Sequence, residues 1–188
     1  MGSEMCIRDS LKILGFHFGR KPNAVDHVAK LIDRMYGKLW TLRFLKRSGM
    51  EQHDLLQIYK TILRPSAEYS SVIYHSLIPE YLANKLESFQ RQALKIIYGW
   101  DTNCDALIEN GTIELLSKRR QDSILKFALK AAASPRFGPS WFKETPISSR
   151  EVRATTRKKY IEKQCKTDRS RNNPLEYMTK TLNEFYSK

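Results

Sequence analysis

The stretch VDHVAKLIDRMYGKLWTL, residues 25–42, decides the fold that the sequence predicts. Its apolar residues recur at steps of three and four and are Val25, Val28, Ile32, Met35, Leu39 and Leu42. At about 100° per residue these positions share one face of a helix. Lys30, Arg34 and Lys38, spaced four residues apart, fall almost opposite that face. The stretch therefore predicts a long helix with one buried side and one basic ridge.

Two further amphipathic helices are predicted to pack on the first. One runs over residues 51–63, and Pro65 is expected to kink or break it because proline lacks a backbone donor. The other runs over residues 79–98 and is stopped by Gly99. Residues 21–100 are therefore predicted to form a small helical bundle.

Shorter helices are expected towards the carboxy terminus. A short helix near residues 105–109 and a longer one over 115–133 make a helical extension, residues 101–137. Residues 174–188 are predicted to form a terminal helix that can dock back. The intervening residues 138–173 are rich in Lys and Arg and poor in apolar residues, so a basic, partly disordered linker is expected there.

The amino-terminal residues divide into two parts. Residues 1–10, MGSEMCIRDS, have no apolar period and resemble the translation of a sequencing adapter, or are an ordinary disordered end. If they are adapter-derived, the native start is missing. Residues 11–18, LKILGFHF, alternate partially and predict one strand, interrupted by Gly15, within a segment over residues 11–20. A single strand needs a partner, which is expected to come from a part of the protein absent here.

The net charge of the chain narrows the classes of molecule that it is expected to bind. The 188 residues include 33 Lys and Arg against 20 Asp and Glu, a formal net charge of +13. Such an excess is typical of proteins that bind a polyanion such as RNA or DNA. No apolar run approaches the roughly 18 residues of a membrane span, so no membrane partner is expected. The three cysteines lie far apart, which fits a reducing compartment and an intracellular location, cytoplasmic or nuclear.

No catalytic or metal-binding pattern is present in the sequence. The four histidines are isolated, and no pair of adjacent aspartates could hold two cations for phosphoryl transfer. Asp26 and Asp33 are interpreted as surface charges. We therefore predict no catalytic residue, no metal ligand and no cofactor in this chain.

Five short motifs follow one another along the chain. They are Leu14-Gly15-Phe16; Arg64-Pro65 with Glu68-Tyr69; Leu86-Glu87, Gln90-Arg91, Ala93-Leu94 and Ile96-Ile97; Leu116 with Arg119-Arg120 and Phe127-Ala128; and Pro174, Tyr177, Met178, Leu182 and Asn183. In this order they resemble the carboxy-terminal end of the reverse transcriptases (RNA-directed DNA polymerases) of non-LTR, LINE-type and jockey-like, retrotransposons.

The resemblance implies a truncated polymerase. It matches residues 11–20 to the last strand of the palm and residues 21–100 to the thumb, while the Tyr-x-Asp-Asp catalytic turn, the fingers and most of the palm are absent. Mg²⁺ would then belong only to the parent enzyme, and the chain alone should not polymerise DNA. The expected fold is mainly α: a small thumb-like helical bundle with one orphan N-terminal β-strand and a basic, partly disordered C-terminal segment.

The resemblance also implies partners, namely the missing fingers and palm and a template–primer of RNA or DNA held through its phosphates. The ridge of Lys30, Arg34 and Lys38 is the first predicted contact. The second is the basic segment that contains Arg153, Arg157, Lys158 and Lys159.

Two alternatives stay open: a self-sufficient basic helical module that binds RNA or DNA, and a helical protein-interaction module whose charge is incidental. Trp40, Trp100 and Trp141 are expected to anchor the core or loops rather than to stack on bases.

Overall fold

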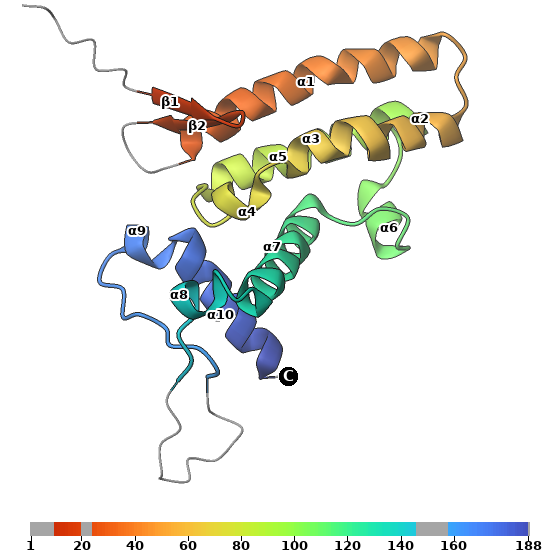
Figure 1. Ribbon diagram of the computed structural model, residues 1–188. Coiled ribbons are helices and arrows are strands. Elements are labelled where there is room, and N and C mark those ends of the chain that lie inside the picture. Colours follow the sequence, from red (N-terminus) through yellow and green to blue (C-terminus); the bar gives the residue numbers. More distant parts are fainter. Residues whose placement is uncertain (1–9, 20–23, 146–157, 188) are drawn as a thin grey trace, which may run out of the picture. The chain divides into compact units, whose positions relative to one another are not determined.

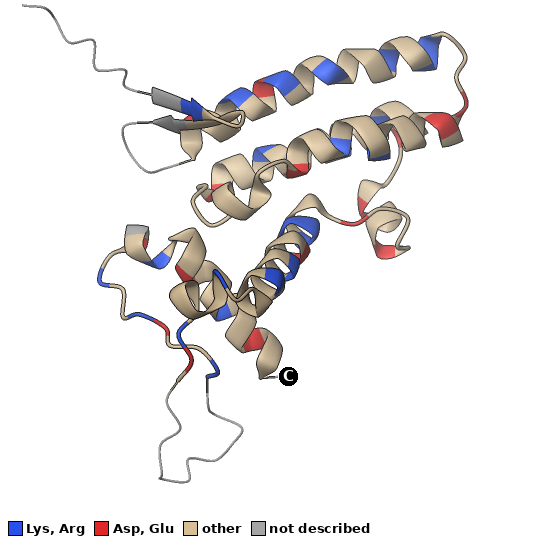
Figure 2. Ribbon diagram, viewed as in Figure 1, with Lys and Arg blue, Asp and Glu red and all other residues tan. Residues whose placement is uncertain are grey.

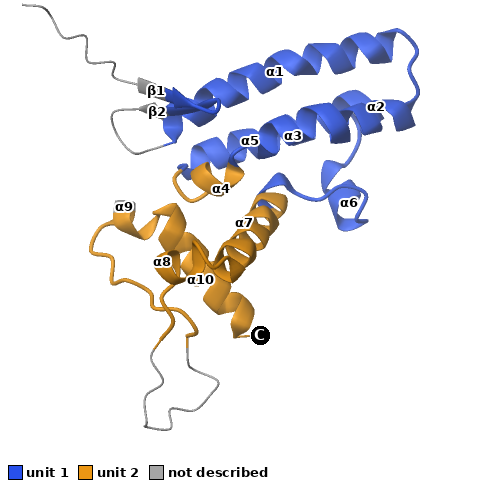
Figure 3. Ribbon diagram, viewed as in Figure 1, with its two compact units in different colours: residues 1–70, 78–117 blue, residues 71–77, 118–188 orange. Residues whose placement is uncertain are grey.

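A computed structural model describes residues 10–19, 24–145 and 158–187 (Figure 1). The protein is mainly helical, with a two-stranded antiparallel sheet at its amino-terminal end, as the sequence predicts for the fold class. It forms two compact units, one of residues 1–70 and 78–117 and the other of residues 71–77 and 118–188 (Figure 3). These units do not follow the segment boundaries expected from the sequence.

The first unit contains the expected helical bundle. Helix α1 (Val25–Arg47) packs along α5 (Glu80–Tyr98) and along the helical segment that runs through α2 (Gln52–Ile58) and α3 (Arg64–Glu68). The short helix α6 (Cys104–Glu109) follows α5. The core side chains that are fully or almost fully buried include Val28, Met35, Leu39, Leu42, Tyr59, Leu63, Leu86, Phe89 and Ala93. Burying each large apolar side chain contributes about 1.5–3 kcal/mol, so these faces hold the bundle together.

A π-helical turn, η1 (Tyr59–Leu63), joins α2 to α3. The buried residues Leu55, Tyr59, Leu63 and Ala67 are spaced by steps of four. In a regular α-helix each step of four rotates the side chain by about 40°, so the series would leave the core. The wider turn, in which Arg64 donates its N–H to the Tyr59 carbonyl, cancels part of that drift. The helical path therefore continues past Pro65, where a kink or break was expected, and ends at Glu68.

The expectation of a single orphan strand is wrong. Residues 10–19 form a β-hairpin in which β1 (Ser10–Ile13) pairs with β2 (Phe16–Gly19). Leu14 and Gly15 make the turn with φ of 47° and 81°, the backbone that a tight two-residue hairpin turn requires. The partner of the strand therefore comes from the chain itself, including Ser10 of the segment that resembles an adapter.

The hairpin rests on α1 through aromatic contacts. Phe16 is buried and stacks on His27, with ring centroids 4.0 Å apart. The backbone N–H of His17 donates to Nδ1 of His27 at 3.3 Å. Burial, followed by the nearby charges of His17 and Arg34, lowers the pKa of His27 to about 4, which keeps the ring neutral and able to accept. A two-stranded hairpin is marginal by itself, so this docking stabilises it.

The second unit has its own core. It comprises α4 (Ser71–Tyr74), α7 (Leu116–Ala133) from Lys118 onward, α8 (Gly138–Trp141), α9 (Asp168–Arg171) and α10 (Pro174–Tyr186). Met178 and Leu182 of α10 are buried with Ile124 and Ala128 of α7. The terminal helix expected from the sequence therefore forms and packs on the longer helix.

Part of the predicted linker is held in place. Thr145 N–H donates to the Lys159 carbonyl at 3.0 Å, and Ile161 N–H donates to the Lys143 carbonyl at 2.8 Å. The Asn183 amide of α10 accepts from the Tyr160 N–H at 2.8 Å and donates to the Tyr160 carbonyl at 3.0 Å. Residues 158–161 are thus fastened to α10, and residues 146–157 of the predicted linker lie outside the described residues.

Candidate nucleic-acid interface

Helix α1 carries the predicted basic ridge on an exposed face. Lys30, Arg34 and Lys38 are all exposed, and blue Lys and Arg positions recur along α1 in Figure 2. Six Lys and Arg residues and two Asp residues occur in this helix. The interval of four residues sets neighbouring ridge positions about 6 Å apart along the axis. Helix α1 therefore presents a line of positive charge.

The ridge is not straight, because each step of four turns the side chain by about 40°. It starts at Lys30 and winds to the boundary with α3, where the Lys38 Nζ donates to the Ser66 Oγ at 2.6 Å. Arg34 lies between them and donates its Nε–H to the Lys30 carbonyl at 3.2 Å. Lys38 is therefore at the edge of the buried face rather than opposite it.

A pocket of about 370 Å³ opens beside the ridge. Leu31 and Met35 of α1 supply buried apolar side chains to its lining. Its other lining residues are Gly15, Arg34, Lys38, Ser66 and Tyr69. The hairpin turn, α1 and α3 thus combine two cations with an apolar wall in one cavity.

Two of the reverse-transcriptase-like motifs meet at this pocket. The Tyr69 hydroxyl donates to the Leu14 carbonyl, and an added Cβ at Gly15 would lie 3.7 Å from the Tyr69 ring. Arg64 and Glu68 form an ion pair at 3.6 Å that is about four-fifths buried. Pro65 lies in the first turn of α3. These residues shape the pocket and the helix beside it.

Two residues of the third motif fasten the start of α7. The fully buried Gln90 side chain donates to the Glu114 carbonyl at 2.8 Å and accepts from the Leu116 N–H at 3.1 Å. Glu87 Oε1 accepts from the Ser117 N–H at 2.8 Å. A carboxylate at a helix N-terminus also interacts favourably with the helix dipole. Glu87 and Gln90 are therefore structural residues whose side chains hydrogen-bond the backbone around the start of α7.

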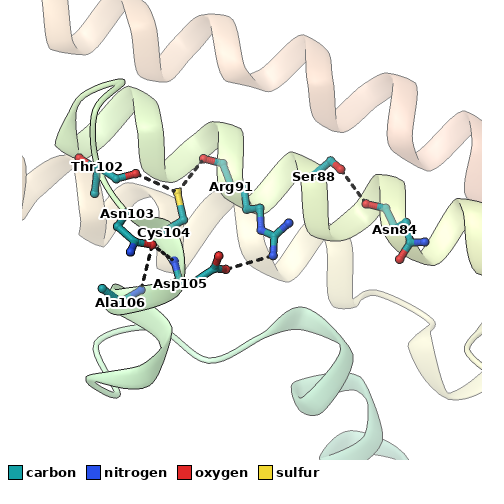
Figure 4. A network of polar contacts seen from close by, with 8 residues as sticks. All are labelled: Asn84, Ser88, Arg91, Thr102, Asn103, Cys104, Asp105 and Ala106. Carbon is teal, nitrogen blue, oxygen red and sulfur yellow. Dashed lines mark hydrogen bonds and ion pairs between the residues drawn. The ribbon is translucent and has the colours of Figure 1, made fainter.

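The remaining residues of this motif are also structural. Leu86, Ala93 and Leu94 are buried in the core. Arg91 forms an exposed ion pair with Asp105 of α6 at 3.0 Å, as Figure 4 shows. Beside it, the Cys104 thiol lies 3.7 Å from the Arg91 carbonyl. The motif holds α6 and the first residues of α7, Leu116 and Ser117, against α5.

The second predicted set of cations behaves differently from the ridge. Arg153 and Arg157 lie outside the described residues. Lys158 forms an ion pair with Glu162 at 2.6 Å. The Lys159 Nζ lies 3.9 Å from the centroid of the Tyr186 ring, a cation–π contact. Both described lysines are therefore engaged within the second unit.

Arg120 of the fourth motif is buried, although arginine is usually a surface residue. Its Nε lies 3.4 Å from Nδ1 of His75, and the Tyr177 hydroxyl lies 3.3 Å from Nε2 of the same ring. Burial, followed by the charge of Arg120, lowers the pKa of His75 to about 4. This cluster fixes α4, α7 and α10 together and does not present a charge to a ligand.

Trp40 and Trp100 depart from the expectation that the tryptophans anchor the core or loops. Trp40 is 65% exposed and stacks on the exposed Phe44 of the same helix, with centroids 5.4 Å apart. Trp100 is 68% exposed, and Trp141 packs on Phe137. The sequence contained the signal for Trp40, because position 40 falls outside the apolar arc of α1. An aromatic surface therefore lies on the helix that carries the basic ridge.

Within residues 10–19, 24–145 and 158–187, no three His, Cys, Asp or Glu side chains gather to hold a metal ion. Asp26 and Asp33 are exposed on α1. No helix in the described part of the chain combines the length and the apolarity needed to cross a membrane. Comparison with protein-family models, with curated proteins and with solved structures found no match.

Proposed function

We propose that this chain is the carboxy-terminal part of a non-LTR retrotransposon reverse transcriptase, and that its first unit binds a template–primer nucleic acid. The observation that carries the binding function is the exposed line of Lys30, Arg34 and Lys38 on α1. Cations in such a line attract phosphates and set the register of a strand without reading its bases. The chain alone is not a polymerase, and Mg²⁺ chemistry belongs to the parent enzyme.

The spacing of the ridge suits a nucleic-acid backbone. From Lys30 to Lys38 the helix rises by about 12 Å, while successive phosphates of one duplex strand are about 3.4 Å apart along the axis. A duplex lying along α1 would therefore place three or four phosphates beside the ridge. Lys38 is held by Ser66 and Arg34 by the Lys30 carbonyl, so both side chains are partly ordered before binding.

The proposed origin is supported by the way the motifs pair. Tyr69 of the second motif donates to the carbonyl of Leu14 in the first, and Gln90 of the third accepts from the N–H of Leu116 in the fourth. Motifs far apart in sequence thus act on one another. The hairpin supplies no argument for a missing palm, because its strands pair with each other.

That self-paired hairpin favours a second candidate function, a stand-alone module that binds RNA or DNA. The transcript upstream of residue 11 distinguishes the two. An in-frame Tyr-x-Asp-Asp sequence a few dozen codons earlier supports the polymerase fragment, whereas an authentic start codon just before residue 11 supports the module. Primer extension by the purified chain with Mg²⁺ would contradict the proposal that it is not an enzyme.

Binding is tested by titrating a labelled RNA–DNA duplex with the full chain at several salt concentrations, about 50–200 mM. Replacing Lys30, Arg34 and Lys38 by Gln is expected to weaken binding and to reduce the slope of log K against log salt by up to about 2.7, or 0.9 per phosphate contact. The control replaces three exposed lysines of α7, Lys118, Lys126 and Lys130, by Gln, which removes the same charge.

The control variant distinguishes the effect of the position of the ridge from the effect of net charge. The α7 variant should keep most of the affinity and most of the salt slope. Equal losses in both variants would show that only net charge matters. Absence of binding by the unsubstituted chain at about 50 mM salt would remove the nucleic-acid function altogether.

A further inference from the structure

The pocket beside the ridge is built for a ligand smaller than a duplex. Its volume of about 370 Å³ lies at the lower end of the range for small-molecule sites. Its lining includes the charged side chains of Arg34 and Lys38 and the apolar side chains of Leu31 and Met35. We propose that this pocket binds a single nucleotide, with its phosphate at Arg34 and Lys38 and its base against the apolar lining and Tyr69.

The two cations are positioned to bind a phosphate. The Ser66 hydroxyl donates to the Ile62 carbonyl at 3.0 Å and accepts from Lys38 at 2.6 Å, which fixes the ammonium at the pocket edge. The ammonium keeps two further N–H donors. In its bond to the Lys30 carbonyl Arg34 uses Nε, so within the described residues its terminal amino groups stay available for a charge-assisted contact.

The rest of the pocket suits a planar ring. Leu31 and Met35 are buried and provide apolar contact surface. The Tyr69 ring is 51% exposed, and its hydroxyl is tied to the Leu14 carbonyl, which restricts how the ring can turn. Gly15 lies beside this ring, because a Cβ added there would be 3.7 Å from Tyr69, at ordinary contact distance. Stacking of a base on such a ring contributes about 1–3 kcal/mol.

This inference rests on the proposed function, because Arg34 and Lys38 belong to both the ridge and the pocket. A duplex on the ridge would leave the pocket for one unpaired nucleotide of the same strand, such as a strand end. The phosphate could equally be free inorganic phosphate, and the experiment therefore includes that ion. A nucleotide is favoured over a bare anion because cations and apolar surface occur in the same cavity.

The test is a titration of the ¹⁵N-labelled full chain with adenosine monophosphate, adenosine and inorganic phosphate, followed by amide NMR shifts. Adenosine monophosphate should give saturable shifts at Gly15, Arg34, Lys38, Ser66 and Tyr69. Adenosine and phosphate should each bind about tenfold more weakly, because each lacks one half of the interaction.

A pair of variants separates ring stacking from charge. Tyr69→Leu should weaken binding of adenosine monophosphate by about tenfold while leaving the duplex salt slope unchanged. Tyr81→Leu, which alters a tyrosine of similar exposure on α5, should change neither.

The possible outcomes separate this inference from the proposed function. Shifts that avoid the pocket, or phosphate binding as tightly as adenosine monophosphate, would overturn the nucleotide site. Duplex binding without nucleotide binding would also overturn it while leaving the proposed function intact. Nucleotide binding at these residues in a chain that does not bind a duplex would support the pocket and refute the proposed function. If Tyr69→Leu does not fold, the amide shifts of the unsubstituted chain on titration with adenosine monophosphate still test whether the pocket binds a nucleotide.

Discussion

Replacing Gln90 by Leu should destabilise the first unit strongly, although the two side chains are similar in size. The Gln90 amide makes two hydrogen bonds, to the Glu114 carbonyl at 2.8 Å and from the Leu116 N–H at 3.1 Å, and the side chain is only 1% exposed. Leucine removes both hydrogen bonds, and the loss of a buried hydrogen-bond partner costs about 1–3 kcal/mol. Better burial of the apolar side chain offsets part of this, so the expected loss is about 2–4 kcal/mol.

The loss is measured by urea unfolding followed by far-UV circular dichroism. The matched control is Gln92→Leu, two residues along the same helix and partly exposed, for which a change below about 0.5 kcal/mol is expected. Amide exchange at Leu116 should accelerate in the Gln90 variant and not in the control. If the two variants unfold at the same urea concentration, the buried amide does not fasten α7 as argued.

Three further predictions concern other parts of the fold. Gly138→Ala should lower the melting temperature, because its Cβ would lie 2.4 Å from a backbone carbonyl oxygen, whereas Gly37→Ala, with no atom within 4 Å, should raise it slightly. Asn183→Ala should speed amide exchange around Tyr160, whose N–H and carbonyl it releases, and unchanged exchange would argue against this clamp. Burial lowers the pKa of His75 from 6.5 to about 4, a difference equivalent to about 3 kcal/mol; because the ring is only partly buried, the free energy of unfolding is expected to fall by about 1–2 kcal/mol as the pH falls over that range. His75→Gln should flatten this pH dependence, and an equally steep curve in that variant would refute it.

The parts predicted well from sequence are those with a regular helical period. Helix α1 has apolar steps of three and four, and α10 begins at a proline, a favoured first helical residue. Their bounds match the predictions within a few residues. In both helices the local preference and the packing agree, so the pattern alone was sufficient.

The hairpin was missed because its turn carries a weak sequence signal. A two-residue turn normally uses Asn-Gly or Asp-Gly, since both positions need positive φ. Here Leu14 adopts a φ of 47°, which a branched side chain rarely does. Contacts made later in the chain, such as that of Tyr69 with the Leu14 carbonyl, help to hold this turn. Such contacts cannot be read from residues 11–18 alone.

The candidate site was only partly predictable. Spacing identified Lys30, Arg34 and Lys38, but placing all three opposite the buried face ignored the rotation that carries Lys38 to Ser66. The pocket needed three segments to converge, which no local pattern encodes. Glu87 and Gln90 were singled out by resemblance, and their contacts with backbone N–H groups appear only once α7 is in place.

The π-helical turn at Tyr59–Leu63 inserts one extra residue into the helical segment that runs through α2 and α3. A regular α-helix along the same path would be one residue shorter. Removing Thr61, which is exposed, would change the buried spacing after Tyr59 from four and four to three and four, the period of an ordinary α-helix. Ser66 and Tyr69 would then keep their orientation toward α1. A chain related to this one could accordingly be one residue shorter at this point and still build the same cavity. Deleting one residue of α1 between Lys38 and Trp40 would instead turn Lys30, Arg34 and Lys38 by about 100° relative to Trp40 and Phe44.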